Sequence, residues 1–128
     1  MPKTKRQIIG QMGEGVACKF LLKKGFSIVA RNYWKKCGEI DIIAKKNGCI
    51  HFVEVKTVSC KNLDQTEDKN PEDNIHFWKL KRLSRVIQTY LIEKSLEDIN
   101  WGFSVALVFL DESKRLARVK VLDDIVLE

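Results

Sequence analysis

The sequence lacks several features that define common protein classes. Its four cysteines include no C-x-x-C pair, so their spacing predicts neither a structural zinc site nor a thioredoxin-like redox motif. No basic segment leads into the apolar core of a signal peptide, and no apolar run approaches the length that spans a bilayer. We therefore expect a cytoplasmic protein with reduced thiols and no membrane partner.

Motifs of several enzyme classes are missing as well. There is no Gly-rich phosphate loop, no G-x-S-x-G elbow and no H-E-x-x-H pair, which disfavours P-loop nucleotide hydrolysis, serine chemistry and zinc proteolysis. Neither of the two histidines, His51 and His76, is convincingly placed as a general base or metal ligand. We expect no organic cofactor.

The composition is that of one globular domain. The chain has 128 residues, of which 45% are hydrophobic and 31% charged, so residues 1–128 should form a single domain with its own core. Residues 58–74 are polar and interrupted by Pro71, which predicts a mobile surface loop of the kind that often carries function. The formal net charge of +6 favours an anionic partner, but only weakly.

Hydrophobic periodicity predicts the order of helices and strands. Apolar residues at spacings of three and four predict helices over about 5–24 and 77–93. Apolar and β-branched runs predict strands over about 26–31, 39–46, 49–57, 101–110 and 116–122. The order α-β-β-β-α-β-β predicts an α/β fold in which helices flank a mixed sheet.

A turn signal predicts which residues of two strands face each other. Asn47-Gly48 is typical of a two-residue hairpin turn. The register that follows sets Asp41 directly opposite Glu54, and Glu39 opposite Lys56. Two carboxylates at that distance repel each other unless a proton or a cation lies between them. The pair is therefore a candidate metal site.

The chemistry of this site would suit a phosphodiesterase. Carboxylate oxygens are the ligands that Mg²⁺ or Mn²⁺ prefers, and Lys56 could orient or deprotonate a water for attack on phosphorus. The alternative is a solvated hairpin face on which Glu39 and Lys56 form an ordinary ion pair. Against that alternative, Ile43 and Phe52 continue the charged face, so the face should be partly covered, and a half-buried acidic pair needs a partner.

Several stretches resemble the YraN-like family of bacterial proteins, in order and spacing from about Gly10 to Val108. They are Gly10-Gln11-Met12-Gly13-Glu14, Ala30-Arg31-Asn32, Gly38-Glu39-Ile40-Asp41-Ile42-Ile43-Ala44, Phe52-Val53-Glu54-Val55-Lys56, and Lys79 with Arg82-Leu83. That family is similar to the restriction-endonuclease-like PD-(D/E)xK superfamily, with archaeal Holliday-junction resolvases nearest in pattern. The resemblance implies a restriction-endonuclease-like sheet of about five strands and a metal-dependent endonuclease acting on branched or structured DNA.

The resemblance also implies roles for individual residues. Asp41 matches the motif aspartate, and Glu54 and Lys56 match the second acidic residue and the lysine. Glu14 matches an acidic residue that reaches from the first helix toward the metal; without the resemblance it would be a surface carboxylate. The implied ligands of Mg²⁺ or Mn²⁺ are thus Asp41, Glu54 and Glu14, with Lys56 as a further catalytic residue.

Two positions depart from the family pattern. Val58 stands where a basic residue is common, and Gly102-Phe103-Ser104 stands where the family commonly has Arg-Phe-Asp. The second change removes a carboxylate from a core strand. The resemblance further implies a homodimer, because resolvase-like relatives act on two DNA strands in symmetric pairs, although the sequence has no dimer signature of its own.

Basic and aromatic side chains near the site are candidate DNA contacts. Residues 32–36 interleave the two kinds, as surfaces that stack on bases and contact phosphates do. The candidate contacts are Arg31, Trp34, Lys35, Lys36 and, on the second helix, Lys79 and Arg82. An ordinary strand edge with a packed Trp34 and a solvent-facing basic helix are the alternatives. The corresponding alternative function is a non-catalytic DNA-binding or protein-interaction module that keeps the nuclease fold.

Overall fold

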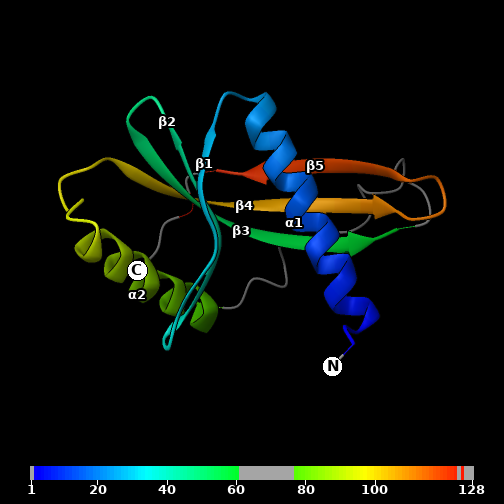
Figure 1. Ribbon diagram of the computed structural model, residues 1–128, viewed down its shortest axis with the longest axis horizontal. Coiled ribbons are helices and arrows are strands. Elements are labelled where there is room, and N and C mark those ends of the chain that lie inside the picture. Colours follow the sequence, from blue (N-terminus) through cyan, green and yellow to red (C-terminus); the bar gives the residue numbers. More distant parts are fainter. Residues whose placement is uncertain (1, 61–76, 124, 126–128) are drawn as a thin grey trace.

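The computed structural model describes residues 2–60, 77–123 and 125, and its elements follow the predicted order (Figure 1). They are α1 (Lys5–Lys23), β1 (Ser27–Lys35), β2 (Gly38–Lys46), β3 (Cys49–Ser59), α2 (Phe77–Glu93), β4 (Trp101–Asp111) and β5 (Leu116–Leu122). The α/β fold is confirmed. Strand β3 extends two residues into the segment predicted as a loop from position 58, and residues 61–74 of that segment lie outside the described residues.

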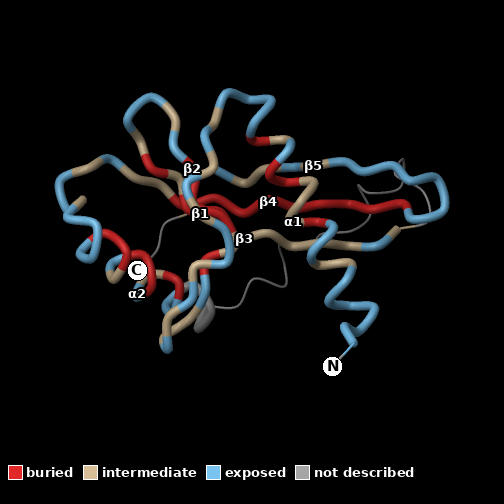
Figure 2. Tube along the Cα trace, viewed as in Figure 1, coloured by how far each residue is buried: buried red, intermediate tan, exposed pale blue. Residues whose placement is uncertain are grey.

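The five strands form one mixed sheet in the order β1-β2-β3-β4-β5. All neighbours are antiparallel except β3 and β4, which are parallel. A parallel pair needs a long crossover, and α2 lies in that connection. Strand β4 is buried along most of its length, as Figure 2 shows, because both of its faces are covered.

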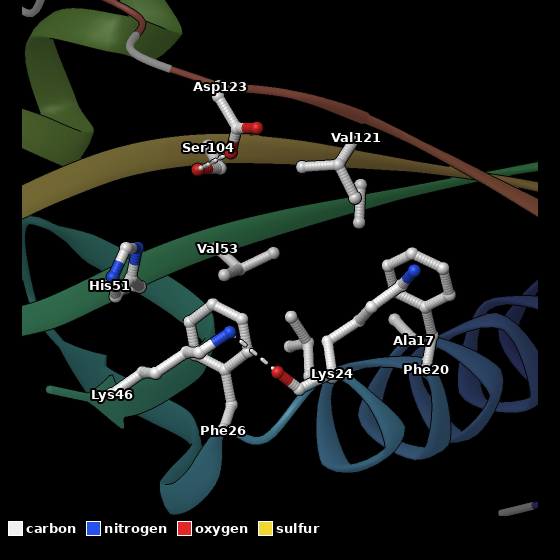
Figure 3. Close-up of a pocket in the computed structure, with 12 residues that line it drawn as sticks. Ala17, Phe20, Lys24, Phe26, Lys46, His51, Val53, Ser104, Val121 and Asp123 are labelled. Carbon is white, nitrogen blue, oxygen red and sulfur yellow. Dashed lines mark hydrogen bonds between the residues drawn. The ribbon is translucent and has the colours of Figure 1, made fainter.

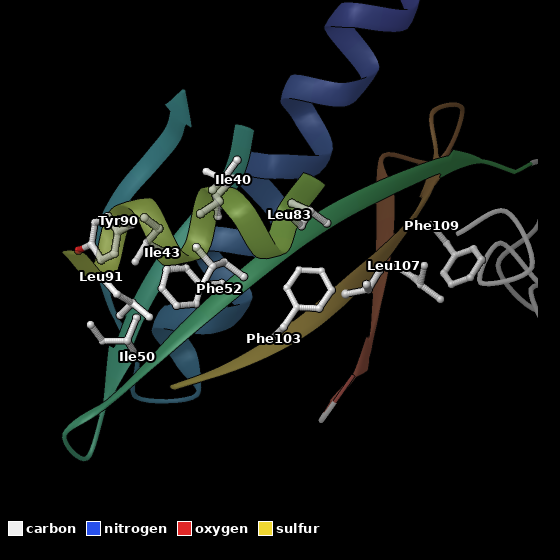
Figure 4. Close-up of a cluster of buried hydrophobic side chains, with 13 residues drawn as sticks. Ile40, Ile43, Ile50, Phe52, Leu83, Tyr90, Leu91, Phe103, Leu107 and Phe109 are labelled. Atoms are coloured by element: carbon white, nitrogen blue, oxygen red, sulfur yellow. The ribbon is translucent and has the colours of Figure 1, made fainter. Parts of the chain in front are cut away.

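The two helices cover opposite faces of the sheet. Neighbouring residues of a strand point to opposite faces, and Phe52 packs in the cluster that contains α2 whereas Val53 packs in the cluster that contains α1. Figure 4 shows the α2-side cluster, in which Phe52 and Phe103 of the sheet lie near Leu83 and Tyr90 of α2. The sheet is therefore the middle layer of three.

The hairpin between β2 and β3 confirms the predicted turn and most of the predicted register. Asn47 and Gly48 both have positive φ, 53° and 75°, as a type I′ turn requires. The pairs run from Lys46–Cys49 to Ile42–Val53 as expected, and the ladder stops there. The further predicted pairs, in which Asp41 faces Glu54 and Glu39 faces Lys56, are not part of it.

The ladder stops because the two strands follow different neighbours. Strand β3 is paired with β4 from Ile50 to Ser59, while β2 stays paired with β1 as far as Gly38. The alternation of β2 also breaks at this point, since Ile40 and Ile43, three residues apart, pack in the same cluster. Asp41 therefore lies at an irregular position where two strands diverge.

Candidate metal centre

An open hollow of about 620 Å³ lies between the first half of α1 and the place where β2 and β3 diverge. Three of the four residues assigned to catalysis from the sequence line it together, each from a different element: Glu14 of α1, Asp41 of β2 and Glu54 of β3. The remaining lining residues are Lys5, Arg6, Ile9, Gly10, Val55, Thr57 and Ser59. The structure thus brings together carboxylates that are far apart in the sequence.

Asp41 is held by the main chain of the neighbouring strand. The Val55 N–H donates to Asp41 Oδ2 at 2.7 Å, which replaces the missing ladder bond at the divergence. Burial raises the pKa of Asp41 to about 8, and the charges of Glu54 and, to a smaller degree, Glu14 act in the same direction against the Val55 bond. In the metal-free site, burial and the neighbouring carboxylates therefore favour the protonated form of Asp41.

Asn32 joins two further carboxylates and was not singled out from the sequence. Its φ of 53° lies in the left-handed region, and it stands opposite Asp41, because Arg31 pairs with Ile42 and Tyr33 with Ile40. In the amide orientation that satisfies its neighbours, its nitrogen donates to Glu39 Oε1 at 3.0 Å and to Glu14 Oε2 at 3.2 Å. An asparagine directly after the strand predicted over about 26–31 is the signal that could have found it, because asparagine adopts the left-handed region more readily than most residues.

The Asn32 contacts hold Glu14 and Glu39 at the edge of the hollow. Burial, followed by the charges of Glu14 and Glu54, raises the pKa of Glu39. Arg31 Nη2 lies 3.9 Å from Glu14 Oε2, so Glu14 receives a cation as well as the amide. The acidic cluster is therefore compensated on the β1 side by neutral and cationic donors.

The variant Asn32→Asp tests this compensation. It replaces an amide donor by a fifth carboxylate beside Glu14 and Glu39, so we expect the free energy of unfolding at pH 8 in EDTA to fall by about 1–3 kcal/mol. The matched control is Asn47→Asp, which makes the same change at the same φ of 53° in an exposed turn. Chemical denaturation of both variants measures the effect, and equal losses would contradict the bridging role of Asn32.

The metal-free site also predicts a pH dependence of stability. Because the pKa of Asp41 is raised from its ordinary value of 3.8 to about 8, the folded chain binds more protons than the unfolded chain between these values. Stability from this group is therefore present at low pH and is lost as pH rises toward 8. Mg²⁺ should compete with the same proton, so its apparent affinity should increase with pH over that window.

Denaturation curves between pH 5 and pH 9, recorded with EDTA and with Mg²⁺, measure this effect. We expect the stabilisation by Mg²⁺ to grow as pH rises and to level off above about pH 8. A stabilisation that does not change with pH would show that the cation does not replace the Asp41 proton.

Lys56 is not brought to the hollow. It is half-buried on β3, two residues after Glu54, and is absent from the lining residues. Val58, two residues further along β3, packs against the cluster on the α2 side, whereas Glu54, two residues before Lys56, lines the hollow, so alternation alone assigns Lys56 to neither side. The same packing accounts for Val58, whose apolar side chain contacts the α2-side core.

The departure at Ser104 lies at a different cavity. Ser104 is buried and its hydroxyl donates to Asp123 Oδ1 at 3.1 Å, beside a cavity of about 270 Å³ under the C-terminal half of α1 (Figure 3). A carboxylate thus lies next to position 104 even though the residue there is serine. Neither residue lines the hollow that contains Asp41.

The structure places the candidate DNA contacts on β1, on the turn after it and on α2, and Arg82 lies close to that turn at Gly38. Lys35 Nζ lies 2.6 Å from Glu93 Oε1, so this lysine joins β1 to α2. Trp34 is 66% exposed, which excludes the alternative of a packed strand edge at this residue. Lys36 and Arg82 are exposed, and the side chain of Lys79 lies outside the described residues. Among the candidates at positions 31–36, Trp34 and Lys36 are exposed and form no ion pair with another described residue.

The donor set fits a magnesium ion. Within residues 2–60, 77–123 and 125, no three His, Cys, Asp or Glu side chains stand close enough to hold a metal jointly. Mg²⁺ usually takes only one or two protein carboxylates and keeps several waters. Asp41, oriented by the Val55 N–H, and Glu54 beside it supply hard oxygen donors of that kind.

The fold and the site define an α/β protein with a carboxylate-lined hollow where two strands of a mixed sheet diverge. The model of the uncharacterised protein family UPF0102 matches residues 13–121, and the chain belongs to this family, which is the YraN family that its motifs resemble. In the part of the chain that is described, no helix has the length and apolarity of a bilayer span.

Relatives in several bacteria match along most of their length. A UPF0102 protein of Alkaliphilus metalliredigens is 36% identical over 108 residues, covering 84% of this chain and 90% of the relative. One of Chloroherpeton thalassium is 35% identical over 116 residues, covering 91% and 86%. One of Helicobacter pylori is 38% identical over 111 residues, covering 87% and 88%.

Proposed function

We propose that the protein is a metal-dependent DNA endonuclease of the restriction-endonuclease-like kind, which hydrolyses phosphodiester bonds in branched or otherwise structured DNA. The observation that carries the proposal is the pair Asp41 and Glu54, two carboxylates that line one open hollow, where burial and the charge of Glu54 raise the pKa of Asp41. Such a pair costs stability, so a fold that keeps it is best explained by a cation that binds there.

The residues divide the work of hydrolysis between them. Asp41 and Glu54 would hold Mg²⁺ or Mn²⁺, with Glu14 assisting from α1, and the bound ion would polarise the phosphoryl group and lower the pKa of a bound water. The Val55 N–H keeps the Asp41 carboxylate in one orientation. Lys56 is proposed to orient the attacking water, which requires its side chain to turn toward the hollow when substrate binds.

The experiment is a cleavage assay on a panel of four-way junction, nicked, single-stranded and linear duplex DNA. We expect cleavage of at least one structured substrate with Mg²⁺ or Mn²⁺ and no cleavage with EDTA. A preparation of Asp98→Asn, which changes an exposed carboxylate outside the hollow, should behave as the wild type. Failure to cleave any substrate with either metal would overturn the enzymatic proposal.

The second candidate is a non-catalytic DNA-binding or protein-interaction module. The position of Lys56 favours it, because this side chain is not among those that line the hollow. Such a module would bind DNA equally well with and without Mg²⁺. Binding titrations in Mg²⁺ and in EDTA therefore separate the two candidates.

A further inference from the structure

We infer that Lys5 and Arg6 form a binding site for a backbone phosphate of the nucleic-acid strand that enters the hollow. The inference rests on the proposed function and names the part of that site that takes the substrate. Both residues belong to the first turn of α1 and line the same hollow as Asp41 and Glu54. The hollow is therefore lined by cations from the first turn of α1 and by carboxylates from α1, β2 and β3.

This division of charge suits a phosphodiester chain. A bound cation would neutralise part of the charge at Asp41 and Glu54 and would attract one phosphate, but the neighbouring phosphates of the strand would still face acidic residues. Lys5 and Arg6, in the first turn of α1, would bind a neighbouring phosphate, offset that repulsion and fix the direction in which the strand lies. A small neutral ligand would gain no charge–charge attraction from either the cations or the carboxylates.

The two cations are available for a ligand. Lys5 and Arg6 are exposed, and neither forms an ion pair or a hydrogen bond with another described residue. Other basic side chains of the domain are engaged: Arg31 with Glu14, and Lys35 with Glu93. A free surface cation can bind a phosphate without first breaking an internal interaction.

Helix energetics alone would not select these residues. The first turn of a helix favours acidic side chains, yet the first turn of α1 has none and carries Lys5 and Arg6 instead. The main-chain N–H of Gln7 is satisfied by Thr4 Oγ1 at 3.1 Å in a capping box. The basic side chains, and not that amide, are therefore the groups offered to an anion, which would also gain from the helix dipole.

The test measures DNA binding by the double variant Lys5→Ala/Arg6→Ala in the non-cleaving Asp41→Asn background, with a four-way junction as the probe and salt varied. We expect affinity to fall about tenfold at 0.1 M salt, and the slope of log K against log salt to decrease by about 1.5, because each phosphate contact contributes about 0.7–0.9. In the wild-type background, KM should rise by more than kcat falls.

The matched control is Lys19→Ala/Lys23→Ala, which removes the same charge from exposed positions of the same helix outside the hollow. Equal losses in the two double variants would overturn the inference, as would unchanged binding or an absence of DNA binding even at low salt. Because binding is measured without turnover, a selective loss in Lys5→Ala/Arg6→Ala supports the phosphate site even if no cleavage is ever found. Circular dichroism checks that the double variants keep their helix content. The variant Lys5→Gln/Arg6→Gln removes the two charges but keeps long polar side chains, and it must give the same binding defect.

Discussion

Replacing Asp41 by asparagine is expected to lower the rate of Mg²⁺-dependent DNA cleavage by about 10³-fold or more, a loss of about 4 kcal/mol of transition-state stabilisation. Asparagine still offers an oxygen to the Val55 N–H, so the local structure should be kept. What it removes is the charge that holds the cation beside Glu54. Single-turnover cleavage of the substrate identified on the DNA panel measures this effect.

The same variant should be more stable than the wild type when metal is absent. Asparagine relieves the repulsion and burial that raise the pKa of Asp41, so we expect the free energy of unfolding at pH 8 in EDTA to rise by about 1–3 kcal/mol. Lower activity with higher stability is typical of a functional residue that strains its fold. Undiminished cleavage by Asp41→Asn, or a clear loss of its stability, would contradict the assigned role.

Replacing Gly13 by alanine is expected to destabilise the domain by about 1–3 kcal/mol, although alanine is the better helix former. Gly13 is buried where α1 crosses β3, and a Cβ there would overlap the Thr57 side chain, including its Cβ. Rotation of Thr57 cannot relieve that overlap, so the helix must shift. Because Glu14 is the next residue, affinity for Mg²⁺ should fall as well.

A control for this prediction lies two residues further along the same helix. A Cβ at Gly15 meets nothing within 4 Å, so Gly15→Ala should stabilise the domain by up to about 1 kcal/mol. Thr57→Ala in the Gly13→Ala background should restore part of the stability, because it removes two of the overlapping atoms. Denaturation of the variants measures these effects, and a destabilising Gly15→Ala would show that the close approach at Gly13 is not the cause.

The elements and the hairpin could be predicted because their signals are local. Asn47-Gly48 alone determines the pairs from Lys46–Cys49 to Ile42–Val53. The end of that ladder could not be predicted in the same way. It depends on β3 pairing with β4, which is about fifty residues further along the chain, and on the break in alternation at Asp41.

The site could be predicted only in part, because it also depends on contacts between distant segments of the chain. The hairpin register and carboxylate chemistry identified Asp41 and Glu54, the resemblance added Glu14, and these three residues line one hollow. The position of Lys5 and Arg6 at the hollow was missed, because basic residues in the first turn of a helix give the same sequence pattern when they only face solvent. The ion pair of Lys35 with Glu93 of α2 could not be predicted, because only the packing of the helix against β1 brings these residues together, and Lys35 as a DNA contact stays a prediction. The homodimer stays a prediction.

The central claim is that Asp41 and Glu54 form a divalent-metal site. Anomalous diffraction from crystals soaked in Mn²⁺ tests it most directly. We predict a peak bonded to carboxylate oxygens of Asp41 and Glu54, at the roughly 2.0–2.2 Å expected for such an ion, and its disappearance in Asp41→Asn crystals. A peak bound only to other residues, or no peak at a manganese concentration that supports cleavage, would contradict the claim.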